Sequence, residues 1–77
     1  MVYEKLCEIL EDIFELDEGF LTKETSFSET LNADMEDLIE LSLIIEEEFD
    51  ILVSETELED VETVGDLEKL IEQKSEA

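Results

Sequence analysis

The stretch LNADMEDLIELSLIIEEEFDI, residues 31–51, decides the fold of this chain. Asp34 is a favourable N-cap residue and Asp37 stands three positions later, which predicts that a helix begins near Asp34. Apolar residues then recur at steps of three and four, the spacing of one buried helical face: Leu38, Leu41, Ile45 and Phe49. We therefore expect one long helix that ends near Asp50.

This helix combines a wide apolar face with a dense row of acids. Ile39, Leu43 and Ile44 widen the apolar face that the four-residue steps define. The opposite face is acidic and carries Glu36, Asp37, Glu40, Glu46 and Glu47. A solvated face is the simplest interpretation in so acidic a chain, and a partner-binding face is the functional one.

The segment before this helix predicts a first helix and a long loop. Apolar residues at helical spacing lie within residues 2–16, and the sequence Asp-Glu-Gly at 17–19 should end that helix, with Gly19 free to adopt a positive φ. Residues 17–34 then form a long connection. Four apolar residues should pin it to the core: Phe20, Leu21, Phe27 and Leu31.

The C-terminal third predicts two more helices. Residues 51–54 read as an extended buried connector, since no partner strand is apparent, and residues 55–60 as a short helical turn. Thr63 should cap a last helix with Asp66 at its third position, and residues 72–77 should fray. The expected fold is an all-α, small four-helix bundle, with three main helices and one short helix, in a single domain spanning residues 1–77.

Charge limits the partners that the chain can have. The 77 residues include 26 acids and four lysines, for a net charge of −22. Such a chain repels nucleic acid and anionic membranes and attracts basic protein surfaces. An apolar patch beside the acids would also suit weak self-association.

Several chemistries are excluded by composition. There is no histidine, which removes Ser/His and Cys/His catalysis and the usual zinc ligands. Cys7 is the only cysteine and sits among apolar residues, as a core or half-core thiol does. We expect no metal site and no enzymatic activity. With no apolar run of spanning length and no signal-peptide pattern, the expected location is the cytoplasm.

Two segments resemble the acyl carrier protein family. They are FSETLNADMEDLIELSLIIEEEFDI, residues 27–51, and TVGDLEKLIE, residues 63–72. The resemblance implies a four-helix bundle with a long first loop. It also implies a serine that carries a 4′-phosphopantetheine arm, on which acyl groups are held as thioesters. The acidic second helix of such proteins docks onto basic patches of acyl-transfer and synthase enzymes.

The chain departs from this pattern at the attachment point. Met35 occupies the serine position and Glu36 the position of the following leucine. A thioether has no hydroxyl to form the phosphodiester, so we expect no cofactor attachment. Ser42, Ser26 and Ser28 are not in register to replace it. Carried over by position, the partner-binding residues would be Asp34, Glu36, Asp37, Glu40 and Glu47, with Glu36 included on charge alone.

Three hypotheses follow from the sequence. The first is a carrier-like domain of fatty-acid or polyketide-type metabolism that lacks the attachment serine and acts by non-covalent docking of its acidic second helix. The second is a functional acyl carrier that is loaded at an unusual residue or is present here in altered form. The third is a plain acidic helical protein-binding module.

Overall fold

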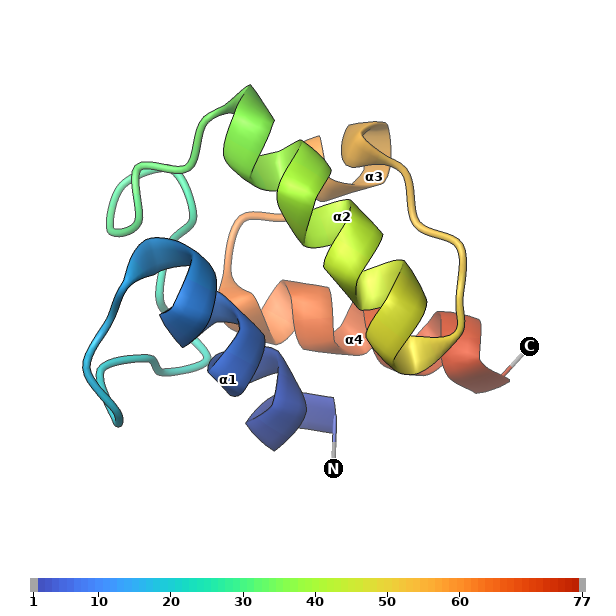
Figure 1. The fold of residues 1–77 in the computed structure, drawn as a ribbon, viewed down its shortest axis with the longest axis horizontal. Coiled ribbons are helices and arrows are strands. Elements are labelled where there is room, and N and C mark those ends of the chain that lie inside the picture. Colours follow the sequence, from blue (N-terminus) through green and yellow to red (C-terminus); the bar gives the residue numbers. More distant parts are fainter. Residues whose placement is uncertain (1, 77) are drawn as a thin grey trace.

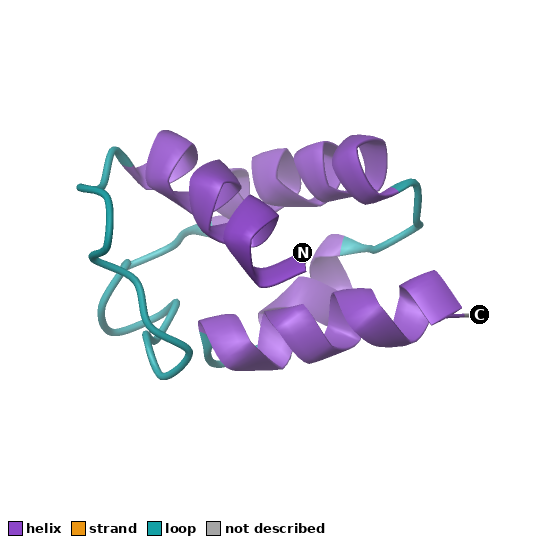
Figure 2. Ribbon diagram, turned by 90° about the horizontal axis from the view of Figure 1, so that it is seen from below, coloured by secondary structure: helices purple, strands orange, loops and turns teal. Residues whose placement is uncertain are grey.

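The computed structural model describes residues 2–76, which fold into four helices joined by loops (Figure 1). The helices are α1 (Val2–Phe14), α2 (Met35–Phe49), α3 (Glu55–Glu59) and α4 (Val64–Glu76). α2 packs against α1 and α3, and α1 packs against α4. The loop between α1 and α2 gathers at one end of the molecule (Figure 2). The predicted all-α architecture, with three main helices and one short helix, is confirmed.

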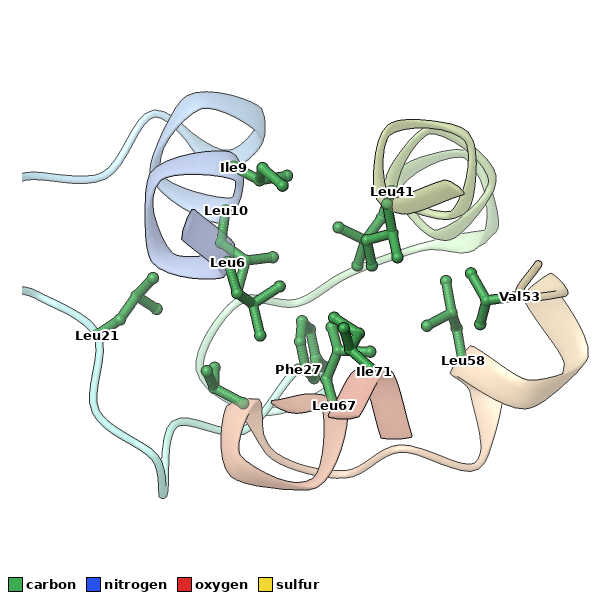
Figure 3. Close-up of a cluster of buried hydrophobic side chains, with 12 residues drawn as sticks. Leu6, Ile9, Leu10, Leu21, Phe27, Leu41, Val53, Leu58, Leu67 and Ile71 are labelled. Carbon is green, nitrogen blue, oxygen red and sulfur yellow. The ribbon is translucent and has the colours of Figure 1, made fainter. Parts of the chain in front are cut away.

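One hydrophobic cluster joins the four helices (Figure 3). Each helix contributes side chains that are at most 3 % exposed, among them Leu6, Leu10, Leu41, Ile45, Leu58, Val64, Leu67 and Ile71. Full burial of a leucine or isoleucine stabilises a fold by roughly 1.5–3 kcal/mol. The apolar steps that define the helices in the sequence are therefore also what hold them together.

The long loop is fastened to the start of α4 by backbone hydrogen bonds. The Val64 N–H donates to the Thr25 carbonyl oxygen at 3.0 Å, and the Gly65 N–H donates to the Lys23 carbonyl oxygen at 2.9 Å. A Cβ atom at position 65 would lie 3.0 Å from that same oxygen, so any other residue would push this backbone contact apart by a few tenths of an ångström. Phe27, 6 % exposed, anchors the middle of the loop in the core. This attachment fixes where the chain enters α2.

The first helix is shorter than predicted. It ends at Phe14, because Glu15 adopts the left-handed conformation with φ 54°. The Leu16 N–H then donates to the Glu11 carbonyl oxygen at 2.9 Å, as in a Schellman cap. Leu16 turns back against the core, and this packing offsets the cost of the left-handed residue. Gly19 does have a positive φ of 86°, but it forms a later turn rather than the helix end.

Two apolar residues that were assigned to the interior are exposed. Phe20 was expected to pin the long loop and is 50 % exposed. The segment 51–54 was expected to be buried, yet only Val53 is enclosed, at 2 %, whereas Leu52 is 81 % exposed. An extended chain turns alternate side chains to opposite sides, so one of these two neighbours must face solvent.

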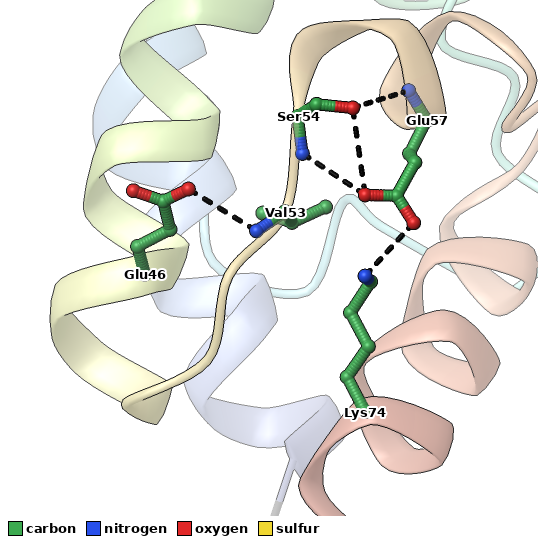
Figure 4. Close-up of polar contacts among 5 residues, drawn as sticks. All are labelled: Glu46, Val53, Ser54, Glu57 and Lys74. Atoms are coloured by element: carbon green, nitrogen blue, oxygen red, sulfur yellow. Dashed lines mark hydrogen bonds and ion pairs between the residues drawn. The ribbon is translucent and has the colours of Figure 1, made fainter. Parts of the chain in front are cut away.

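The end of α4 is helical over residues 72–76, where fraying was predicted, and Ala77 lies outside the described residues. The Lys74 ammonium contacts a carboxylate oxygen of Glu57 at 2.8 Å (Figure 4). The other oxygen of Glu57 accepts the Ser54 N–H at 3.1 Å, while the Ser54 hydroxyl accepts the Glu57 N–H at 3.2 Å. This reciprocal capping box starts α3 and ties the short helix to the last turns of α4.

Candidate functional site

The N-terminus of α2 is closed by a pair of aspartates. The Asp37 N–H donates to Asp34 Oδ1 at 3.0 Å, and the Asp34 N–H donates to Asp37 Oδ2 at 3.2 Å. Each carboxylate thereby satisfies a backbone donor that the first turn leaves free, and both lie at the positive end of the helix dipole. The predicted cap is confirmed. Asp34 and Asp37 therefore stabilise the N-terminus of α2, whatever else they bind.

Met35 is the first residue of α2 and directly follows the cap. Its side chain is 47 % exposed. The position is therefore open to a partner, but the group it presents is an apolar thioether.

Four glutamates of α2 are exposed, and Glu48 is the one among them that pairs with a lysine, Lys5. We call the other three, Glu36, Glu40 and Glu47, the acid row. The ion pairs that lysines form within residues 2–76 involve other carboxylates: Lys5 pairs with Glu48, Lys23 with Glu68 and Lys74 with Glu57. The acid row is thus uncompensated by any lysine in the described chain. Its field is available to attract a positively charged surface.

Glu46 differs from its neighbours in the acidic segment. Its Oε2 accepts the Val53 N–H at 3.1 Å (Figure 4), and its side chain is only partly exposed. Val53 is buried, so this carboxylate satisfies a backbone donor that water does not reach. The structure therefore removes Glu46 from the predicted acidic face and makes it a tether between α2 and the connector to α3.

Two of the residues that widen the apolar face of α2 lie on its surface. Ile39 is 42 % exposed and Leu43 is 61 % exposed, whereas Ile44 is partly buried against the core. With Met35 they form a line at four-residue steps, which we call the apolar row. The same periodicity is visible in the sequence, but there it could not be assigned to the core or to the surface.

The hydroxyls near α2 are not placed as substitutes for one at position 35. Ser42 is 5 % exposed, and its hydroxyl donates to the Ile39 carbonyl oxygen at 2.9 Å. Ser26 accepts the Glu29 N–H at 3.1 Å within the loop, and Ser28 is on the same turn. None of these three hydroxyls lies in the first turn of α2.

The interior beneath α2 is filled. The space between α2, α3 and α4, lined by Phe27, Leu38, Leu41, Leu58, Val61 and Leu67, has ≈ 0 Å³ of room for a water-sized sphere. An open surface groove of ≈ 240 Å³ lies beside it, near Ser28 and Ala33. The resemblance implies that an acyl chain can tuck between the helices, and within residues 2–76 the space that these six side chains line leaves no room for one.

The half-buried thiol of Cys7 lies on α1, away from these groups. Burial raises its pKa, which disfavours the nucleophilic thiolate. The predicted half-core thiol is confirmed. Within residues 2–76 no cluster of three potential metal ligands is formed, and none of the described helices is long and apolar enough to cross a bilayer.

The chain has clear relatives among known proteins. The family described as "Phosphopantetheine attachment site" matches residues 4–71. The acyl carrier protein of Clostridium acetobutylicum is 40 % identical over 76 residues, which cover 99 % of each chain. A match of this length, on a fold with the helix order and long first loop that the resemblance implies, leads to one conclusion. The chain belongs to the acyl carrier protein family, a family of carriers rather than catalysts.

Proposed function

We propose that this chain is an acyl-carrier-type domain that docks onto basic partner enzymes without carrying 4′-phosphopantetheine. The observation that carries the proposal is Met35, an exposed thioether at the first position of α2. The helix around it keeps the cap and the acids of a carrier. In this proposal the chain has lost its attachment chemistry and retains its recognition surface.

The residues at the start of α2 do not fit covalent attachment of the arm. A phosphodiester needs a hydroxyl oxygen, and a thioether sulfur has no proton to give up in its place. Ser42 is enclosed and already hydrogen-bonded. The helix terminus still favours an anion electrostatically, but no side chain in its first turn could tether one.

Docking is assigned to the acids of α2. The acid row of Glu36, Glu40 and Glu47 would meet lysine and arginine side chains of the partner, and Asp34 and Asp37 would add charge at the helix start. The partners would be acyl-transfer or synthase enzymes with basic surfaces. With a net charge of −22, long-range attraction should speed such encounters at low salt.

The loss of attachment is tested by intact mass. The native chain, Met35→Ser and Met35→Ala are each incubated with coenzyme A, magnesium and a broad-specificity phosphopantetheinyl transferase. Only the serine variant should gain the mass of one arm. A gain by the native chain would contradict the proposal, and mapping of the modified residue would then support the carrier that is loaded elsewhere.

The docking assignment is tested by binding to the same transferase and to a ketosynthase. Glu40→Lys and Glu47→Lys should each weaken binding by roughly tenfold at low salt. Glu72→Lys, at an exposed position of α4, makes the same change in net charge away from α2. If all three variants lose affinity equally, the effect is one of total charge, and α2 is not the docking face.

A further inference from the structure

The apolar row of Met35, Ile39 and Leu43 lies beside the acid row on the exposed side of α2. Its members are 47 %, 42 % and 61 % exposed, and steps of four residues keep them on one side of the helix. Glu36 and Glu40 stand one position after Met35 and Ile39, about 100° further around the helix. Glu36 and Glu40 therefore lie alongside the apolar row, and Glu47, four residues after Leu43, lies at its C-terminal end.

We propose that Met35 is the apolar anchor of the docking face. It enters an apolar cleft on a basic protein partner, with Ile39 and Leu43 continuing the contact, while the acid row pairs with lysine and arginine beside that cleft. This inference rests on the proposed function and adds a role for the residue that replaces the attachment point. In this proposal Met35 removes the attachment point for the cofactor and adds an apolar contact with the partner.

The acid row and the apolar row should contribute to binding in different ways. Charge pairs at an exposed rim mainly set encounter rate and orientation, whereas buried apolar side chains supply most of the affinity. Methionine is flexible and polarizable, which suits insertion into a cleft of irregular shape. Its place at the first residue of the helix puts it at the end of the apolar row.

A basic partner fits this face better than a second copy of the chain does. A symmetric pair joined through the apolar row would bring the same surface of each copy together. The uncompensated acid row of one chain would then lie against that of the other, and like charges disfavour such a contact. A surface that offers an apolar cleft edged with positive charge complements both rows at once.

The test compares Met35→Gln with Met35→Leu, using the transferase and the ketosynthase as probes. Glutamine keeps the length of methionine and makes its end polar, whereas leucine keeps the side chain apolar. Leu52→Gln removes an apolar side chain that is 81 % exposed but lies outside α2, and serves as the matched control. Met35→Gln should weaken binding roughly tenfold, and the other two variants by less than about twofold. The loss should persist in high salt, unlike that of Glu40→Lys.

The outcomes separate this inference from the proposed function. If Glu40→Lys weakens binding and Met35→Gln does not, docking stands and the anchor is refuted. If neither variant changes binding, or the native chain binds neither probe, both ideas fail. Sedimentation of the free chain tests whether a second copy of the chain covers the apolar row instead. A dimer that dissociates on the Met35→Gln substitution would overturn the basic partner in favour of that second copy.

Discussion

Replacing Glu46 by alanine should destabilise the fold, whereas the same change at the next residue, Glu47, should not. The two side chains carry equal charge and belong to the same helix. Glu46 accepts the Val53 N–H at 3.1 Å, and Val53 is 2 % exposed, so that donor would be left without a partner. Glu47 is exposed and belongs to the acid row.

The magnitude follows from the environment of the hydrogen bond. An unsatisfied buried donor costs about 1–3 kcal/mol, and partial exposure of Glu46 places the expected loss at about 1.5 kcal/mol. For a domain of this size each kcal/mol lowers Tm by about 4–8 °C, so Glu46→Ala should melt about 6–12 °C below the matched control. Helix propensity changes equally in both variants.

Thermal melts of three variants followed by circular dichroism provide the assay. Glu46→Ala, Glu47→Ala and Glu46→Gln each remove one negative charge, so relief of repulsion is common to all of them. Glu46→Gln retains an acceptor for the Val53 N–H and should recover most of the loss. Equal Tm values for Glu46→Ala and Glu47→Ala would refute the assignment of Glu46 as a tether.

Three further predictions concern the core and two titrating groups. Leu67→Ala, at a side chain that is fully enclosed, should cost about 2–5 kcal/mol in urea denaturation, and a loss below about 1 kcal/mol would contradict its place in the core. The hydrogen bond from Lys74 holds the pKa of Glu57 below its ordinary 4.5, so the stability it provides is present above that value and is lost as pH falls through the lowered pKa. Lys74→Met should therefore have a lower free energy of unfolding than Lys69→Met at about pH 7, and this difference should vanish at about pH 2. A difference that does not change with pH would refute the ion pair as its cause. Burial raises the pKa of Tyr3 from 10.0 to about 12. The neutral phenol therefore contributes its full stabilisation below about pH 10, and this stabilisation is lost as pH rises to about 12. Tyrosinate absorbance should titrate with a midpoint of about 12 in the folded chain, and a midpoint of about 10 would show the ring to be solvated.

The sequence by itself determined the elements whose signals are local. Asp34 with Asp37, and Thr63 with Asp66, mark helix starts because each capping bond closes over three residues. The apolar steps within each helix determined its buried face for the same reason, since helical periodicity depends on neighbours along the chain. The family resemblance and the methionine at position 35 were likewise readable without coordinates.

Only the tertiary structure decided which apolar and acidic side chains of α2 are available to a partner. Ile39 and Leu43 continue the apolar pattern, and whether they are covered depends on where α1 and α3 pack against α2. Glu46 and Glu47 are chemically identical in the sequence, and they differ because Val53, seven residues after Glu46, folds back to donate its N–H to Glu46. The end of α1 at Phe14, with Glu15 in the left-handed conformation, similarly depends on Leu16 reaching the core. Local chemistry sets where helices begin, whereas exposure is a property of how they pack, and the candidate docking face is defined by exposure.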